Sequence, residues 1–147
     1  MIKEFAINDL QKCCEVFIQA FNRPPWNDEF TNETAYIYLK ELVDNKRFAG
    51  YTLWDNELLI GAVFCHLRNN WRGDELIVDL MYISPDCQRK GYGEVLMNVV
   101  EKFAKENSCI IITLSTSVGA PAFSFYEKLG FKKVPENFWV SMHKPIK

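Results

Sequence analysis

The sequence has little histidine and no Cys-x-x-Cys pair. Its 147 residues include two histidines, His66 and His143, and five cysteines, and the spacing Cys-x-x-Cys does not occur. An odd cysteine count without such pairs argues against a disulfide framework and against a structural zinc site. We therefore expect reduced thiols and no bound metal.

Long apolar runs and a strong charge of one sign are also lacking. No run approaches the roughly 20 apolar residues of a membrane helix, and the formal net charge is -2. The first residues, Met1 to Glu4, lack the charged and apolar regions of a signal peptide. These absences predict a cytoplasmic protein with neither a nucleic-acid nor a membrane partner.

The sequence is rich in apolar and aromatic residues. Hydrophobic residues make up 48% and aromatic residues 14% of the chain. That content is enough for one hydrophobic core, and no repeat or linker interrupts it. Residues 1–147 are therefore predicted to form a single domain.

The spacing of apolar residues predicts an α+β fold. Helical spacing alternates with continuous apolar runs, which indicates a mixed, mostly antiparallel sheet with helices on both faces. The apolar run at 109–114 predicts a strand buried on both faces. The predicted elements are helices at 10–21, about 31–44, 91–106 and from 121, and strands at 1–6, 48–54, 58–67, 75–83, 109–114, 131–134 and 138–143.

The most informative segment joins the strand that ends at Ile83 to the following helix. Glycines at such a junction expose the first N–H groups of the helix, which favour an anion. The dinucleotide fingerprint fails because Leu96 stands where its third glycine belongs, and no Gly-Lys-Ser/Thr of a Walker A loop is present. The candidate anion-binding residues are Gln88, Arg89, Lys90, Gly91, Tyr92 and Gly93.

This segment resembles the acetyl-CoA pyrophosphate loop of the GNAT superfamily of N-acetyltransferases. Residues 122–131, which read Ala-Phe-Ser-Phe-Tyr-Glu-Lys-Leu-Gly-Phe, resemble the late signature of the same family. The sequence departs from the family at Gly119, where an asparagine is common. The resemblance implies a GNAT-like three-layer fold with acetyl-CoA as cosubstrate and no metal.

The resemblance also implies a reaction. An acetyl group would pass to a primary amine by direct attack in a ternary complex, so no acyl-cysteine is needed and Cys87 is a bystander. Tyr126 matches the tyrosine that protonates the leaving thiolate, although packing is the alternative role. Asp79 is the candidate general base, the alternatives being a structural carboxylate or His66 acting through water. A second function remains open: an acyl-CoA-binding regulatory or interaction module without catalysis.

The strand before the loop is expected to hold the pantetheine arm. By resemblance, the arm pairs with the backbones of Met81, Tyr82 and Ile83, where a bulge would separate this strand from the strand at 109–114. A regular strand would also place five side chains on one face. These are Glu75, Ile77, Asp79, Met81 and Ile83.

An acceptor pocket is expected at the loop between the two early helices, residues 21–30. Trp26 offers a flat apolar surface, and Asp28 and Glu29 offer negative charge, which suits a cationic amine. The alternative is a stiff connector. The acceptor could be an aminoglycoside, a polyamine, an amino acid, a peptide or a protein lysine. A homodimer is also expected, through the aromatic excess and the strand at 138–143.

Overall fold

The computed structural model describes residues 1–135 and 140–147. The chain divides into two compact units, Met1–Ser115 and Thr116–Lys147. The first unit contains the sheet and three of the α-helices, and the second contains one α-helix. The single domain expected over residues 1–147 stays a prediction.

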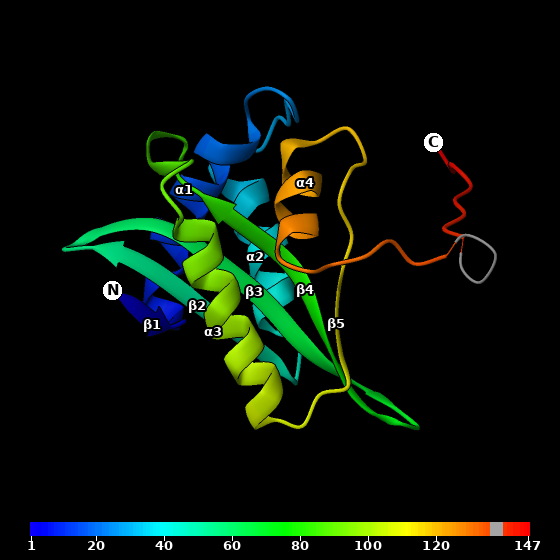
Figure 1. Ribbon diagram of the computed structural model, residues 1–147. Helices are drawn as coiled ribbons and strands as arrows, with labels where there is room; N and C mark the ends of the chain where they lie inside the picture. Colours follow the sequence, from blue (N-terminus) through cyan, green and yellow to red (C-terminus); the bar gives the residue numbers. More distant parts are fainter. Residues whose placement is uncertain (136–139) are drawn as a thin grey trace. The chain divides into compact units, whose positions relative to one another are not determined.

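A five-stranded sheet organises the first unit (Figure 1). The strands follow one another in the order β1 to β5, and each neighbouring pair is antiparallel except β4 and β5, which are parallel. This pairing confirms the predicted mixed, mostly antiparallel sheet. The strands are β1 (Ile2–Glu4), β2 (Phe48–Asp55), β3 (Leu58–Asn70), β4 (Gly73–Ile83) and β5 (Ile111–Leu114).

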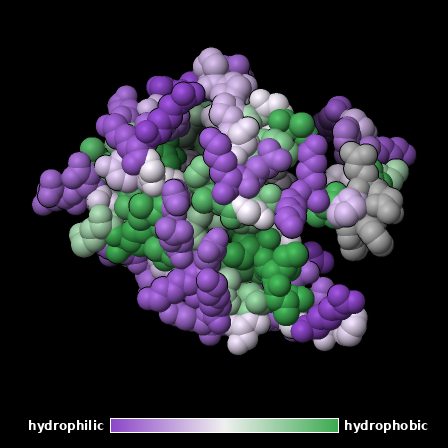
Figure 2. Space-filling view, viewed as in Figure 1, coloured by the Kyte–Doolittle hydropathy of each residue, from purple (hydrophilic) through white to green (hydrophobic). Residues whose placement is uncertain are grey.

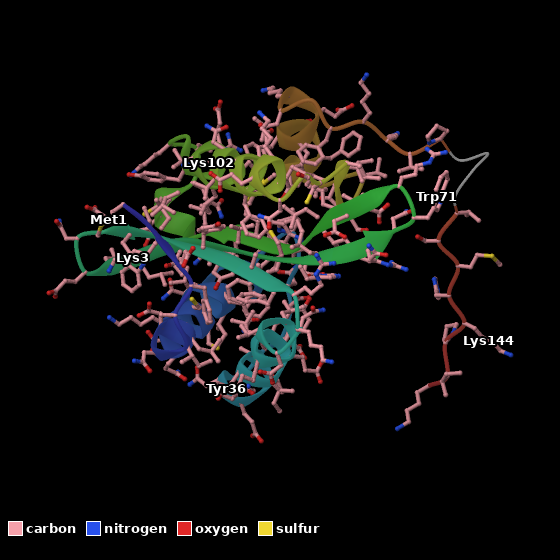
Figure 3. The ribbon with its side chains drawn as sticks, turned by 90° about the horizontal axis from the view of Figure 1, so that it is seen from below. Met1, Lys3, Tyr36, Trp71, Lys102 and Lys144 are labelled. Atoms are coloured by element: carbon pink, nitrogen blue, oxygen red, sulfur yellow. The ribbon has the colours of Figure 1, made fainter. Side chains whose placement is uncertain are left out.

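Helices cover both faces of this sheet, as predicted. Helices α1 (Leu10–Phe21) and α2 (Asn32–Val43) lie on one face, and α3 (Tyr92–Glu106) lies on the other (Figure 3). Thr31 caps α2 through a capping box with Thr34, which explains where that helix begins. Two short 3-10 helices, Ile7–Asp9 and Pro85–Cys87, precede α1 and α3. The fold is the predicted α+β arrangement.

The core on the α1–α2 face follows the predicted apolar stripe of α1. Leu10, Cys13, Cys14 and Phe17 are buried there, together with Phe64 of β3. Residues on the other face of the sheet pack beneath α3, whose buried side chains include Leu96, Met97 and Val100. Both sides of the sheet are therefore hydrophobic, which is the arrangement that a three-layer fold requires.

The second unit contains helix α4 (Pro121–Lys128). Pro121 stands in its first turn, as predicted, because a proline there removes no intrahelical hydrogen bond. Gly130 follows the helix with a φ of 94°, which only glycine adopts without strain. The Phe131 N–H then donates to the Tyr126 carbonyl at 3.1 Å and closes the helix end.

Two predictions about strands are wrong. β5 is an edge strand of the described sheet, and Ile110 and Ile111 are each 49% exposed, so the apolar run is not buried on both faces. Figure 2 shows hydrophobic residues at the visible surface among hydrophilic ones. Residues 131–134 form no strand, and neither do the described residues 140–143, while 138 and 139 lie outside the described residues. A β-strand needs a neighbour to pair with, and sequence patterning alone does not supply one.

The homodimer expectation stays a prediction, although its proposed strand is not found in the described part. Among residues 1–135 and 140–147, no helix has both the length and the apolar character needed to cross a membrane.

Candidate functional site

A β-bulge at Asp79 interrupts the pairing of β3 with β4. Phe64 lies opposite Leu80, whereas the next residue, Cys65, lies opposite Val78. Asp79 is therefore the extra residue on β4. An extra residue bends its strand and increases the local twist, and bulges occur often beside active sites.

The bulge changes which residues of β4 share a face. Residues opposite each other in an antiparallel pair lie on one face, and neighbours along a strand alternate. Ile77 lies opposite His66, and His66 lies opposite Phe48, which packs on the α1–α2 core. Beyond the bulge, Leu80 and Tyr82 belong to that same core. Odd-numbered residues before the bulge and even-numbered residues after it therefore face α1 and α2.

Two sequence predictions about β4 are consequently wrong. The bulge lies at Asp79 and not within Met81–Ile83. Met81 and Ile83 also lie on the α3 face, because the extra residue inverts the alternation beyond it. The sequence carries no local signal for this shift, since a bulge is defined by the partner strand.

β4 and β5 separate at the bulge. Their parallel pairing ends with Val78 opposite Leu114. Hydrogen-bonded pairs alternate along an antiparallel ladder, and the Ser84 N–H donates to the Ile60 carbonyl of β3 at 2.7 Å. Since Ser84 is hydrogen-bonded to β3, Tyr82 is too, while the residues between and before them, Ile83 and Met81, are not. Met81 therefore directs its main-chain N–H and carbonyl away from β3. They face the side on which the pairing with β5 has ended.

The junction between β4 and α3 is an open turn with exposed cations. Arg89 and Gly91 have φ values of 61° and 84°, both in the left-handed region. Gly91 caps α3, and a Cβ built on it would meet nothing within 4 Å. The first N–H groups of a helix have no intrahelical partner, and Arg89 and Lys90 are exposed beside them. This combination of donors and positive charge suits an anion.

Gln88 ties this junction back to β4. Its side-chain Nε2 donates to the Ile83 carbonyl at 3.2 Å. The Cys87 N–H donates to the carbonyl of buried Ser84 at 2.9 Å, a hydrogen bond that closes the short 3-10 helix before Gln88. The side chain of Gln88 therefore fixes the shape of the loop, a contact that the sequence did not indicate.

Asp79 makes a close contact with a histidine on the neighbouring strand. Asp79 Oδ2 lies 2.6 Å from His66 Nδ1, and the two side chains are 21% and 20% exposed. The sequence offered the two residues as separate candidates. The structure brings them together because the bulge turns Asp79 toward the face on which His66 lies.

The loop between α1 and α2 is held by main-chain and side-chain hydrogen bonds. The Asn22 side chain donates to the Phe30 carbonyl at 2.8 Å and accepts from the Phe30 N–H at 3.0 Å. Trp26 remains 40% exposed with its ring 5.1 Å from that of Phe21. The rings of Phe21 and Tyr82 lie 6.3 Å apart, which places this loop over the end of β4 nearest the junction with α3.

Asp28 and Glu29 are exposed on the same loop. The Asp28 N–H donates to the Phe21 carbonyl at 2.9 Å, so the loop backbone is fixed while both carboxylates stay in water. Trp71 does not join them. It lies 86% exposed at the tip of the β3–β4 hairpin (Figure 3), at the other end of β4.

The structure places the remaining candidate residues but does not test their roles, which stay predictions. Tyr82 is buried, its hydroxyl donates to the Cys13 carbonyl at 2.8 Å, and it lies opposite Ala62 in a pair whose main chains face each other, so its part in holding a ligand stays a prediction. Tyr92 is half-buried in the first turn of α3. Tyr126 is buried on α4, with its ring centre 5.2 Å from that of Phe125 and 5.6 Å from that of Phe131.

The cysteines differ in accessibility, which predicts a difference in reactivity. Burial raises the pKa of both the Cys13 and the Cys65 thiol to about 12, and the thiolate is the reactive form. At pH 8, iodoacetamide should modify half-buried Cys87 in the native protein and leave Cys13 and Cys65 unmodified, as read by peptide mass spectrometry. Denaturant should make all five reactive, and modification of native Cys13 as fast as Cys87 would contradict the burial.

Comparisons with known proteins find similar chains among acetyltransferases. Streptothricin acetyltransferase A of Bacillus subtilis is 28% identical over 114 residues, which are 77% of this chain and 62% of that protein. The chain thus matches less than two thirds of that relative. An aminoglycoside antibiotic 6′-N-acetyltransferase from Acinetobacter haemolyticus superposes with a TM-score of 0.76 at 18% identity, covering 100% of this chain and 99% of that one.

A third comparison concerns a complex. The structure of AAC(6′)-Iy with the bisubstrate analogue CoA-S-monomethyl-acetylneamine superposes with a TM-score of 0.76 at 14% identity, covering 99% of this chain and 97% of that one. The family model described as acetyltransferase (GNAT) family matches residues 7–131. With that match over most of its length, the chain belongs to the GNAT acetyltransferase family.

Proposed function

We propose that this chain transfers an acetyl group from acetyl-CoA to a primary amine on a small molecule, by direct attack in a ternary complex. The GNAT family uses acetyl-CoA. The observation that carries the proposal is the separation of β4 from β5 at Asp79. Beyond it, the edge of β4 is open and runs to α3, the helix that Gly91 caps.

The residues present fit acetyl-CoA as a substrate. Met81 directs its main chain to the open edge, where the peptide-like pantetheine arm needs a donor and an acceptor. Gly91 leaves space where a side chain would meet a phosphate, and the N–H groups of Tyr92 and Gly93 begin α3. Arg89 and Lys90 add positive charge to that end. We assign the cofactor site to Met81, Tyr82, Ile83, Gln88, Arg89, Lys90, Gly91, Tyr92 and Gly93.

Amine acetylation requires two proton transfers, one from the amine and one to the leaving thiolate. An alkyl ammonium has a pKa of about 10.4, so the amine must lose a proton before or during attack. The thiolate that leaves must gain a proton or depart as an anion. We assign the first transfer to the site around Asp79 and the second to Tyr126, and positioning of the two substrates supplies much of the remaining rate.

The acceptor is proposed to be a cationic small molecule. Trp26 is partly exposed, and Asp28 and Glu29 are exposed, on one loop whose backbone is held by hydrogen bonds. An aromatic face with nearby carboxylates attracts ammonium groups. The names of the relatives, a streptothricin and an aminoglycoside acetyltransferase, support amines of this type.

Acetyl-CoA should stabilise the protein and then be consumed. At a hundredfold excess over its dissociation constant it should add about 2.7 kcal/mol to the free energy of unfolding, which a thermal scan detects. Release of the CoA thiol should then be measured with streptothricin, an aminoglycoside, spermidine and a short peptide as acceptors. The protein should be removed by filtration before the thiol reagent is added, so that its cysteines do not contribute. Acetylated product should be identified by mass spectrometry.

The outcomes separate the two functions that remain open. Stabilisation with turnover of one amine supports the enzyme. Stabilisation with no turnover of any amine would favour an acyl-CoA-binding module. No thermal shift with millimolar acetyl-CoA, and no heat of binding by calorimetry, would contradict both.

A further inference from the structure

The contact between Asp79 and His66 favours one proton arrangement. A carboxylate only accepts hydrogen bonds, so we assign the shared proton to the imidazole Nδ1, which lies 2.6 Å from Asp79 Oδ2. A neutral imidazole that is protonated on Nδ1 has its lone pair on Nε2. Asp79 therefore holds His66 in the tautomer whose other nitrogen can accept a proton.

The pair lies where an amine could meet an acyl group. Asp79 follows Val78, the last β4 residue that pairs with β5. His66 lies on the sheet face that α1 and α2 cover, because it is opposite Phe48 of the α1–α2 core. The loop with Trp26 lies on that same face over Tyr82, about 10 Å along β4 from Asp79 at the usual rise per residue.

Both side chains also remain in contact with solvent. Their exposed fractions of 20% and 21% let a proton leave to water after each turnover. The next opposing pair on this face is Arg68 with Glu75, and it lies farther from the separation of the strands. Glu75 accepts a hydrogen bond from Asn70 at 3.1 Å, so its carboxylate already has a structural partner.

Resting on the proposed acetyl transfer, we infer that His66 Nε2 is the atom that takes the proton from the acceptor amine, with Asp79 as its positioning residue. The ammonium first releases one proton to water, and only the uncharged amine attacks. As its nitrogen bonds to the acetyl carbon, one of its two remaining protons passes to Nε2 and the carbon–sulfur bond breaks. The sulfur leaves as a thiolate, which gains a proton from a general acid or from water. An imidazole, with an ordinary pKa of about 6.5, suits this role near neutral pH better than a carboxylate does, at about 3.9.

Two substitutions distinguish this role from a structural one. In His66→Asn, the side-chain amide nitrogen can keep the donation to Asp79, but nothing replaces Nε2. The turnover number should fall roughly a hundredfold, while KM for acetyl-CoA stays within about threefold. In Asp79→Asn, the amide can donate to Nδ1 and place the proton on Nε2, so a loss of similar size is expected with His66 intact.

The controls keep the result interpretable. His143→Gln replaces the other histidine, which is exposed, and should leave turnover unchanged. A thermal scan should show that His66→Asn remains folded and is still stabilised by acetyl-CoA. Free imidazole should restore part of the turnover of His66→Ala, which a purely structural histidine would not show.

The tautomer gives a readout that needs no acceptor. With ¹⁵N-labelled histidine there are two imidazoles to resolve, and the His143→Gln spectrum assigns them. His66 should show a protonated Nδ1 and an unprotonated Nε2 at pH 8. The inference is overturned if Nε2 carries the proton at pH 8, or if His66→Asn keeps turnover within twofold, which would leave Asp79 to act directly. If no amine is acetylated by the parent protein while the tautomer is as expected, the proposed function fails and the pair is structural.

Discussion

Replacing Gly91 by valine should remove acetyl-CoA binding. Gly91 has a φ of 84°, which a β-branched residue adopts only with strain, and the space around its missing Cβ is empty to 4 Å. In the proposed complex that space is where the pyrophosphate approaches the N–H groups of α3. The affinity should fall at least a hundredfold, so the stabilisation by acetyl-CoA at the same ligand concentration should drop from about 2.7 kcal/mol to about 0.4 kcal/mol or less.

A matched glycine separates lost binding from backbone strain. Gly130 has a φ of 94°, and a Cβ built on it would also meet nothing within 4 Å, but it follows α4 and lies outside the proposed phosphate loop. Gly130→Val should lower the melting temperature without ligand and yet keep the shift with acetyl-CoA. If Gly91→Val binds acetyl-CoA as the parent does, the loop assignment is wrong.

Replacing Tyr126 by phenylalanine should lower turnover roughly a hundredfold. The substitution keeps the buried ring, which lies 5.6 Å from Phe131 between ring centres, and removes the hydroxyl that is proposed to protonate the thiolate. Affinity for acetyl-CoA should change little, because the change concerns the chemical step. The turnover number and kcat/KM should therefore fall together.

Tyr51→Phe is the matched control for this experiment. Tyr51 is a partly buried tyrosine on β2, with its ring centre 6.3 Å from that of Phe103, and no role in acetyl transfer is assigned to it. Its substitution should leave turnover unchanged. A thiol leaves more easily than an alkoxide, since its pKa is about 8.5 on the cysteine scale. Turnover of Tyr126→Phe within twofold of the parent, where chemistry limits the rate, would remove the hydroxyl from the mechanism.

Several elements could be predicted because their signals are local. The helix from Leu10 to Phe21 could be predicted from its apolar spacing, and Cys13, Cys14 and Phe17 on its apolar side are buried. Proline and glycine mark the ends of α4 through backbone geometry that belongs to the residue itself. The glycine-containing junction before α3 could likewise be predicted, because a strand–helix turn often needs a positive φ, which glycine adopts without strain.

The sequence by itself thus determined the fold class, the family resemblance and the place of the glycine-containing junction before α3. Only the tertiary structure decided which residues of β4 face which helix, and therefore that Asp79 meets His66 while Met81 turns the other way. The reason is physical: the bulge at Asp79 exists only in the register of β4 against β3. Residues 65 and 78 are neighbours through that register alone, and no pattern along one strand encodes the alignment with another.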